Sequence, residues 1–440
     1  MWMEYEKYKD MDPDWDLLEP DCKYREWNDP KCLNCINLYS CHTPPKHPDD
    51  RYDDETEFIY NILEFSEPVE TIKDNISYTP LEILRANRRM IGYGYWSKDK
   101  KRFYDYGRDS LIIPDTFESD GVNYIVNSIG KGGFFHCDDL KVVSLPHTVK
   151  SIGSQAFDEC LKLEAIYIGK GLEKAERIFI LCDRLRKIKI HRDNPYFCDV
   201  DGVMYSKDMK VLVRYPQDKI GEEYVVPDGV ERIGTLAFYG CERLKSIILP
   251  DSVKEIDEGA FWYCRKLVSI NLPNGITALN DNVFMACNSL ESIDIPESVS
   301  IIGKCAFDDC ERIKVIKLPE KISSIGDFAF SCCHSLESIN LPQGITKISK
   351  GLFHRCDSLS SLELPQNIES IGDFAFDSCP FTTLTIPSSV KYLGKAIFDD
   401  CSNLTHLIYK GWLYHWTLIE KETEWDKING YQIGIRVKCE

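Results

Sequence analysis

Four cysteines near the start of the chain have the spacing of metal ligands. Cys32 and Cys35 form a C-x2-C pair, which lets two thiolates from one tight turn bind the same metal ion. Cys41 follows, and Cys22 or a nearby histidine could supply the fourth ligand. The segment therefore predicts a zinc or iron-sulfur site, and with it a metal-dependent or redox function. The alternatives are free thiols or local disulfides.

A second set of cysteines is repeated along the chain at a fixed spacing. Eleven cysteines each follow a phenylalanine by three residues, and most of these pairs recur every 22 or 23 residues. A fixed period of this length indicates one supersecondary unit stacked on itself as a solenoid. The repeat cysteines are Cys137, Cys160, Cys182, Cys241, Cys264, Cys287, Cys310, Cys333, Cys356, Cys379 and Cys401.

Stacking would place the repeat cysteines in one column. In-register strands lie about 4.8 Å apart with side chains pointing the same way, whereas a disulfide needs Cβ atoms that converge to about 3.8 Å. We therefore expect buried, reduced thiols, at which a serine would lack a partner and cost about 1 to 3 kcal/mol. Cys305 and Cys332 fall outside the column and should be more reactive. The thiols expected to be buried and reduced are those of Cys264, Cys287, Cys310, Cys333 and Cys356.

One basic segment could contact nucleic acid. Residues 85–108 carry eight basic and six aromatic side chains, a mixture that can bind single strands by phosphate contacts and stacking. The alternation of this segment instead favours a strand, a charged turn and a strand that cap the first repeat. The net charge of -18 also argues against a polyanion partner.

Catalytic motifs are missing from the sequence. His136, His334 and His354 lie beside repeat cysteines in turns of different copies, where we expect solvated side chains. There is no phosphate-binding glycine loop, nucleophile elbow or His-x-x-x-His zinc pair. We predict that the protein is not an enzyme.

The elements of the repeat can be derived from residues 290–310, LESIDIPESVSIIGKCAFDDC. Ile293 and Ile295 alternate with an acidic residue, which is the period of a half-buried strand, and Pro296 ends that strand. Gly303 suits a turn with positive φ or a close backbone approach, and KCAFDDC favours a helical or 3-10 turn. The predicted fold is a repeat solenoid of short parallel β-strands with turns and short helical or 3-10 segments.

The period divides the chain into four parts. Residues 1–57 form a segment with sixteen acidic and seven basic side chains. Residues 58–110 are expected to be a linker and N-terminal cap, residues 111–410 the solenoid, and residues 411–440 a C-terminal cap.

Two irregularities interrupt this pattern. The period breaks between Cys182 and Cys241, and apolar-rich runs on either side of Lys207 and Asp208 predict a β-hairpin excursion at about 191–226. Where the period stops, bulky rings can seal the last ladder against water. We expect this cap to be built around Trp412, Tyr414, Trp416 and Trp425.

The repeat unit LxxIxLPxxVxxIGxxAFxxC resembles the BspA-like leucine-rich repeats. The insertion NPYFCDVDGVMYSKDMKVLVRYP and the closing segment LIYKGWLYHW are similar to the excursion and the end of that family. The resemblance covers residues 111–440 and implies a surface or host-interaction protein without a catalytic residue. Separately, CLNCINLYSC resembles the core of SPASM-type iron-sulfur segments, without their following cysteine.

The start of the chain does not match a surface protein. It lacks the basic and apolar regions of a signal peptide, and no apolar run has transmembrane length. We expect either export by another route or a protein that stays inside the cell, so the compartment stays open.

The outward residues of the strands are the candidate binding site. In each repeat the residue between the two strand isoleucines must face away from the core, so these residues form one column. We predict a non-enzymatic interaction or adhesion module that binds a protein or a surface polymer there. The alternatives are a solvated face, with binding by the excursion or the N-terminal segment, or metal binding as above. The predicted column is Ser144, Tyr167, Ile248, Asn271, Asp294, Lys317, Asn340, Glu363 and Thr385.

Overall fold

The computed structural model describes residues 110–425, apart from residues 114, 120, 121, 131 and 176. For residues 116–119 and 122–124 it describes the backbone alone. It also describes the backbone of six further strands, and the N-terminal metal prediction lies outside all of these residues. The six strands are β1 (Leu63–Phe65), β2 (Gly94–Ser97), β3 (Arg102–Asp105), β31 (Lys427–Ile428), β32 (Tyr431–Gln432) and β33 (Arg436–Cys439).

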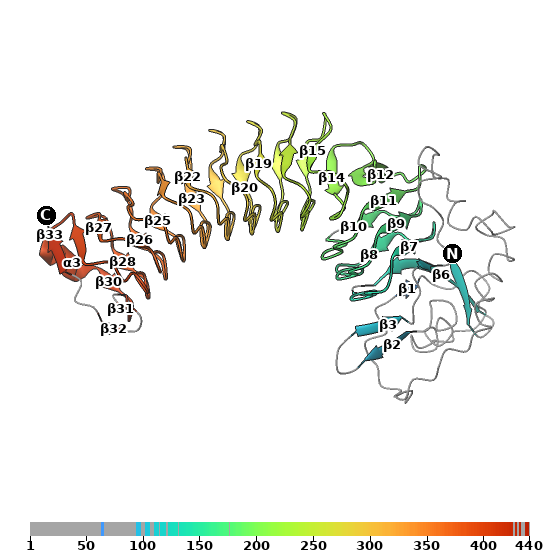
Figure 1. Ribbon diagram of the computed structural model, residues 1–440, viewed down its shortest axis with the longest axis horizontal. Coiled ribbons are helices and arrows are strands. Elements are labelled where there is room, and N and C mark those ends of the chain that lie inside the picture. The colour runs from blue at the N-terminus through green and yellow to red at the C-terminus, as the bar shows by residue number, and fades with distance from the viewer. Residues whose placement is uncertain are drawn as a thin grey trace.

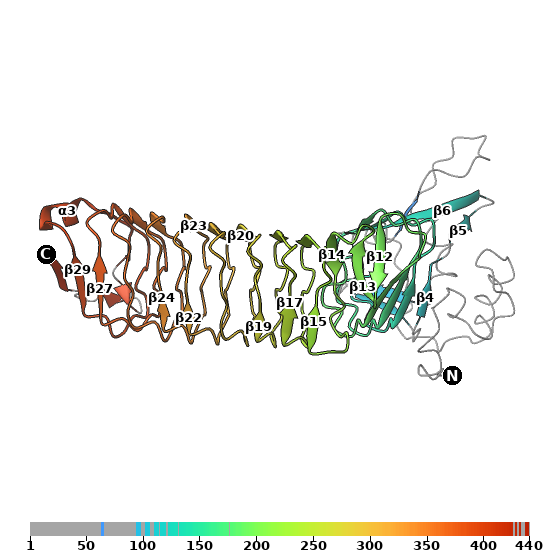
Figure 2. The same cartoon turned by 90° about the horizontal axis from the view of Figure 1, so that it is seen from above.

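The chain forms a long, arched solenoid, which confirms the predicted fold (Figure 1). Most coils contribute one strand to each of two parallel rows, and Figure 2 shows these rows toward opposite sides of the molecule. We call them row A and row B. Consecutive members pair in register, as in Ser246↔Ser269 of row A and Ile301↔Ser324 of row B.

Row A begins with β4 (Ser110–Ile112), β7 (Val142–Ser144), β9 (Ala165–Ile168) and β11 (Lys187–Ile190). After the excursion it resumes with β15 (Glu223–Val225), β17 (Ser246–Ile248), β19 (Ser269–Ile270), β22 (Val315–Ile316) and β24 (Ser338–Ile339). It ends with β27 (Thr383–Ile386), β29 (His406–Tyr409) and β33.

Row B begins with β6 (Val122–Ile129), which also pairs with β1 and β5 (Thr116–Ser119), and continues with β8 (Ser151–Ile152) and β10 (Lys174–Ala175). Its middle strands are β14 (Val211–Arg214), β16 (Arg232–Ile233), β18 (Glu255–Ile256), β20 (Ala278–Leu279), β21 (Ile301–Ile302) and β23 (Ser324–Ile325). Its last strands are β25 (Lys347–Ile348), β26 (Ser370–Ile371), β28 (Tyr392–Leu393) and β30 (Glu420–Lys421).

The repeat phenylalanines form the centre of the core. All eleven are buried, and rings of neighbouring coils stack with centroids from 5.1 Å apart at Phe134 and Phe157 to 6.2 Å at Phe353 and Phe376. The stack is interrupted only where the period breaks, between Phe179 and Phe238. Because each ring is covered by the rings before and after it, no coil can bury its apolar face alone.

The repeat cysteines lie beside this stack as a column of buried, free thiols, as predicted. The prediction that a hydroxyl would find no partner there is wrong. Each thiol from Cys264 to Cys401 donates to the carbonyl of the phenylalanine one coil earlier, as Cys310 Sγ does to Phe284 O at 3.2 Å. That carbonyl also accepts the amide of Cys287 at 3.1 Å. Cysteine is therefore both a small core residue and an inter-coil donor.

We expect Cys310→Ser to cost about 1 kcal/mol, because the hydroxyl can keep a bond to Phe284 O while the apolar contact of the sulfur is lost. Cys310→Ala should cost at least as much, since it leaves a small cavity and removes the inter-coil donor. Urea denaturation of both variants measures the two free energies of unfolding. A serine variant clearly less stable than the alanine variant would show that the hydroxyl is unpaired.

Cysteines outside the column are partly exposed. Cys305 and Cys332 are intermediate in burial, which agrees with their place in the repeat. Burial raises the pKa of Cys305 to about 11, so little of it is thiolate at neutral pH. Their higher reactivity stays a prediction.

The segment from Gly303 to Cys310 is a run of hydrogen-bonded turns rather than a continuous 3-10 helix. Two residues in it, Cys305 and Asp309, have φ values of 49° and 62°, which a right-handed helix does not allow. Gly303 itself does not have positive φ. A Cβ there would lie 2.5 Å from the backbone nitrogen of Asp281, so the close approach of neighbouring coils requires this glycine.

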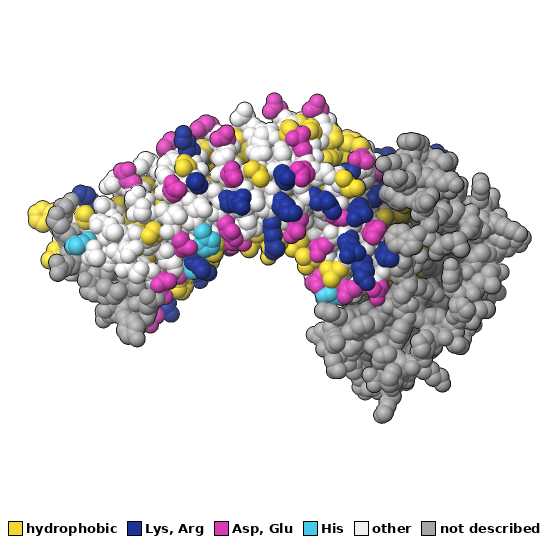
Figure 3. Space-filling view, viewed as in Figure 1, with side chains coloured by type: hydrophobic (Ala, Val, Ile, Leu, Met, Phe, Trp, Pro, Cys, Tyr) yellow, Lys and Arg dark blue, Asp and Glu magenta, His cyan; other side chains and the backbone are white. Residues whose placement is uncertain are grey.

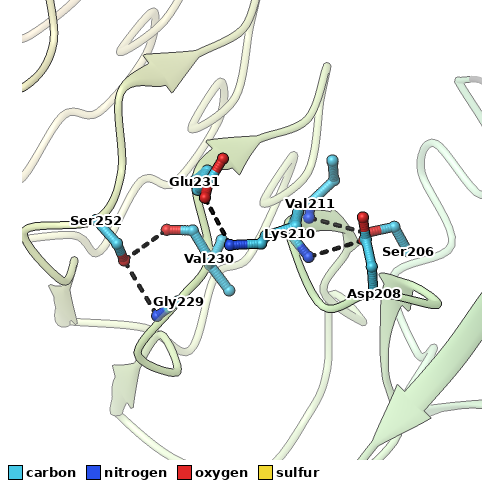
Figure 4. Close-up of polar contacts among 8 residues, drawn as sticks. All are labelled: Ser206, Asp208, Lys210, Val211, Gly229, Val230, Glu231 and Ser252. Atoms are coloured by element: carbon cyan, nitrogen blue, oxygen red, sulfur yellow. Dashed lines mark hydrogen bonds and ion pairs between the residues drawn. The ribbon is translucent and has the colours of Figure 1, made fainter.

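The excursion contains the predicted hairpin and one further strand. β12 (Phe197–Val200) pairs antiparallel with β13 (Val203–Ser206), which pairs antiparallel with β14. Figure 4 shows the turn between β13 and β14, where Ser206 Oγ accepts the amide of Val211 at 2.9 Å and Asp208 accepts that of Lys210. Lys210 Nζ then reaches Glu231 at 2.6 Å, which joins the turn to the next coil (Figure 4).

A coil that the repeat motif does not reveal follows this hairpin. β14 pairs with β16 in row B, and the ring of Tyr215 stacks on Phe238 at 5.2 Å in the place of a repeat phenylalanine. Leu212 precedes Tyr215 by three residues, whereas its register partner Ile233 precedes Phe238 by five. The turn segment of this coil is therefore two residues shorter than in its neighbour.

The Arg214 side chain takes the place of the missing backbone. It is 2 % exposed, and its guanidinium donates to Phe179 O at 2.7 Å on one side and to Leu236 O on the other. These carbonyls belong to the turn segments before and after the shortened coil. Burial lowers the pKa of Arg214, and burial also raises the pKa of nearby Asp158 to about 6.

The C-terminal end differs in part from the predicted aromatic cap. Trp416 is buried on α3 (Leu413–Leu418) and packs against Trp425 with ring centroids 5.8 Å apart. Trp412 and Tyr414 are instead 81 % and 68 % exposed, so their expected role as a seal is wrong. A six-residue helix turns only part of its side chains inward, and Trp416 and the following Ile419 take those positions.

Candidate binding surface

The outward residues of row A from β15 to β24, with the equivalent positions in residues 292–295 and 361–364, form an exposed surface, which we call the strand face. In those two segments, the first of which contains Ile293 and Ile295, the predicted strand does not form. Successive strand residues point to opposite sides, so Ile247 and Ile270 are buried while Ile248 and Asn271 are exposed. Of the predicted column, the members exposed there are Ile248, Asn271, Asp294, Lys317, Asn340 and Glu363.

Three other members of the predicted column are not part of this exposed surface. Tyr167 and Thr385 are partly buried, and Ser144 is fully buried. The strand face therefore belongs to the middle of the solenoid rather than to its whole length.

Two of the exposed residues form hydrogen bonds with the backbone of the preceding coil. The Asn271 amide accepts the N-H of Leu249 at 2.8 Å and donates to its carbonyl at 2.8 Å. Asn340 makes the same pair of bonds to Leu318. These asparagines tie one coil to the next, and each uses one of its two donors and one of its two acceptor positions for the backbone.

The strand face exposes apolar side chains that the predicted column omitted. Val225 is exposed and lies opposite Ile248 in the β15–β17 register, and Val315 is exposed further along. Val225 could have been found from the sequence, because it precedes Ile248 by 23 residues. Ser246 and Ser269 are register partners in the neighbouring column, two residues before Ile248 and Asn271.

The charged residues of the strand face are unpaired. Asp294, Lys317 and Glu363 make no ion pair among the residues that the structure describes. In row B the outward Arg232 binds Asp257 at 2.9 Å, and Lys391 binds Glu369 at 2.9 Å just before β28 and β26. The comparable pair of row A, Lys245 with Glu222 at 2.9 Å, lies just before β17 and β15 and outside the outward column. Unpaired charges beside exposed apolar groups are what a partner could contact, whereas the row B pairs already satisfy one another.

Basic side chains do not make a uniform patch. Figure 3 shows lysine and arginine along the visible face of the solenoid with aspartate and glutamate between them. Lys162 binds Asp139 at 2.7 Å, and Arg186 binds Asp218 at 2.8 Å. Basic residues 85–108 include β2 and β3, which form an antiparallel hairpin, as predicted. Their side chains lie outside the described residues.

The three histidines beside repeat cysteines are paired rather than merely solvated. His136 contacts Glu159 at 2.9 Å, and His334 contacts Asp357 at 2.8 Å. In both pairs the carboxylate lies 23 residues later, one coil further along the stack. Register stacking brings the two side chains together, which the sequence spacing could have shown.

The third histidine lies in a column with the residue types of a hydrolase triad. Ser331, His354 and Asp377 occupy one position in consecutive coils, and His354 Nδ1 lies 2.9 Å from Asp377. Ser331 is 3 % exposed, however, and its Oγ donates to Cys332 Sγ at 3.6 Å. A nucleophile needs access to substrate and a bond to its base, so this column does not form a catalytic site.

Neither a metal cluster nor a membrane-spanning helix occurs in the described part of the chain. No group of three or more potential ligands converges there, and no helix there is long and apolar enough to cross a membrane. The metal prediction concerns Cys22, Cys32, Cys35 and Cys41, none of which is described, and it stays a prediction.

Comparison with protein families gives a match over most of the solenoid. The model of the BspA type leucine rich repeat region matches in six copies over residues 100–199, 218–300 and 277–405. None of the curated proteins compared with the chain matches it.

Solved structures of leucine-rich repeat proteins are also similar. A leucine rich cell surface protein from Faecalibacterium prausnitzii is 24 % identical over 75 % of this chain and 96 % of its own, with a TM-score of 0.49. A leucine-rich repeat protein from Eubacterium ventriosum is 20 % identical over 65 % of this chain and 92 % of its own, with a TM-score of 0.49. One from Bacteroides ovatus is 23 % identical over 77 % of this chain and 98 % of its own, with a TM-score of 0.45. All three TM-scores are below 0.5, so the family assignment depends on the repeat model.

Proposed function

We propose that this chain, which belongs to the BspA-type leucine-rich repeat family, is a non-enzymatic module that binds an extended segment of another protein on its strand face. The repeat scaffold itself is typical of protein-interaction or surface modules.

The observation that supports the strand face is its contrast with row B. Both rows expose side chains, yet the outward Arg232 of row B is paired with carboxylates of the next coil, whereas the described outward charges of the strand face make no ion pair. The strand face instead combines unpaired Asp294 and Lys317 with exposed Val225 and Ile248. Burying apolar groups supplies affinity, and isolated charges supply orientation and selectivity.

The shape of the face favours a chain rather than a globular partner. Its residues lie in two narrow columns along consecutive strands, with serines at positions such as Ser246, Ser269 and Ser292. An extended peptide can lie along such a surface and place alternate side chains against it. A surface polymer is the competing ligand, but the exposed columns offer no ladder of aromatic rings on which sugars stack.

A matched pair of double variants tests the surface. Ile248→Ser with Lys317→Glu changes the strand face, and Ile301→Ser with Lys347→Glu makes the same changes on row B, where Ile301 is 47 % exposed against 42 % for Ile248. We expect the first double variant to weaken partner binding by at least about tenfold, since interface residues commonly contribute about 1 kcal/mol or more. The second should bind as the unchanged protein does.

Capture of the partner from native extract, followed by titration of the purified partner, supplies the measurement. Loss of binding in both double variants would indicate a general defect. If both double variants bind the partner as the unchanged protein does, the strand face is not the binding surface. Asn271 and Asn340 are left unchanged, because their replacement would disturb the coils themselves.

A further inference from the structure

The C-terminal tip of the solenoid carries an exposed apolar surface on α3 and the residue before it. Trp412, Leu413, Tyr414 and Leu418 are between 63 % and 81 % exposed. Three of them are consecutive in the sequence. Exposed apolar residues in isolation are ordinary, but a run of large ones on one short element marks an interaction site. We call these four residues the tip patch.

Contacts of Trp416 and Lys421 on the inward side of α3 hold the tip patch in place. Trp416 packs against Tyr409 with ring centroids 5.3 Å apart, and Lys421 Nζ lies 4.9 Å from the Trp416 ring. The same ammonium group donates to Trp416 O at 2.7 Å and to Ile419 O at 3.0 Å. Because these contacts fix the inward side of the helix, the outward side chains are presented on an ordered base, which lowers the entropic cost of binding.

The patch lies where the stack of coils stops. β30 is the last strand of row B and β33 the last strand of row A, and α3 precedes them in the chain (Figure 1). Figure 3 shows hydrophobic side chains at this tip. A surface at a tip can meet the same surface of another molecule without a clash between the two solenoids.

Charges of both signs flank the patch and suit a copy of the same chain. Lys410 and Glu420 are exposed, and they lie two residues before and two residues after the patch in the sequence, so both signs flank it. A rim with both signs can be complementary to itself across a two-fold axis.

The area of the patch is also consistent with a dimer. A large aromatic side chain covers about 150 to 250 Å², so two aromatic and two leucine side chains offer roughly 500 Å² per copy. Two copies would then bury about 1,000 Å² in total, which is the lower limit for a specific interface. Such an area corresponds to a reversible dimer rather than an obligate one.

We propose that two copies of this protein associate tip to tip through Trp412, Leu413, Tyr414 and Leu418. The two strand faces would then belong to one assembly with two partner sites, which raises the avidity for a repetitive ligand. This inference does not depend on the proposed function, since the tip patch and the strand face share no residue.

Sedimentation velocity of the full chain tests the proposal. Between about 1 and 100 μM, the range of reversible association, the sedimentation coefficient should rise from the monomer value toward that of an elongated dimer. Trp412→Ser with Leu418→Ser should stay monomeric throughout. The control Ile220→Ser with Leu161→Ser, two exposed apolar residues elsewhere, should dimerise as the unchanged protein does.

Each other outcome is informative. A monomer at every concentration overturns the proposal, and so does equal loss of association in the control variant. Flotation of the unchanged protein with phosphatidylcholine vesicles, lost in the tip variant while both stay monomeric, would assign the patch to lipid instead. The thermal midpoint of the tip variant should be unchanged, because both replaced side chains are exposed, and a shared midpoint excludes misfolding as the cause.

Discussion

Replacement of Phe307 by alanine is expected to lower the free energy of unfolding by about 3 to 5 kcal/mol. The ring is fully buried and stacks on Phe284 at 5.4 Å and on Phe330 at 5.6 Å. Its removal opens a cavity between two coils, and the regular backbone bonds on both sides hinder collapse. Urea denaturation followed by circular dichroism measures the loss.

The linear stack adds a second expectation for Phe307→Ala. Each coil contacts only its neighbours, so a weak interface can separate the solenoid into parts that unfold in two steps. Tyr196→Ala is the control, because this aromatic residue is exposed and its loss should change stability by less than about 0.5 kcal/mol. A cost below about 1 kcal/mol for Phe307→Ala would contradict a continuous phenylalanine core.

Arg214→Ala should destabilise the protein by a similar amount, about 3 to 5 kcal/mol. The guanidinium is the donor for two buried carbonyls, Phe179 O and Leu236 O, in the turn segments on either side of the shortened coil. Its loss leaves both carbonyls without this donor and removes the positive charge near Asp158.

A second variant distinguishes the effect of the Arg214 side-chain volume from the effect of its hydrogen bonds. Arg214→Met fills much of the same space but donates to neither carbonyl, and we expect it to remain at least about 2 kcal/mol less stable than the unchanged protein. Equilibrium denaturation compares the three proteins. If the methionine variant were as stable as the arginine, the side chain would be a space filler and not a substitute for the missing backbone.

The sequence predicted the parts of the fold that repeat. Phe307 and Cys310 have equivalents at the same position of every repeat, and stacking the repeats places equivalent residues next to one another. The buried columns of phenylalanine and cysteine, and the alternation of buried and exposed residues along each strand, could therefore be predicted from the spacing. The shortened coil was missed because Tyr215 replaces phenylalanine and two residues are absent before it. The Phe-x-x-Cys pattern consists of residue types that this coil lacks.

Details that depend on side-chain contacts could not be read from the period. The asparagines in the strand column are in the predicted positions, yet Asn271 bonds to the backbone of Leu249, which its residue type alone does not reveal. The cap residues show the same limit, because Trp416 is buried inside a short helix, whereas Trp412, the residue before that helix, is exposed. The C-x2-C motif of the N-terminal cysteines lies outside the repeats, so the period says nothing about their arrangement.

A side-chain footprint of the protein bound to its partner tests the central claim most directly. Brief hydroxyl-radical exposure oxidises accessible side chains, and mass spectrometry compares the free and bound states. Binding on the strand face predicts protection of Val225, Ile248 and Val315, all exposed in the free protein, with Ile301 on row B oxidised equally in both states. Protection of Ile301 with no change at Ile248 would contradict it.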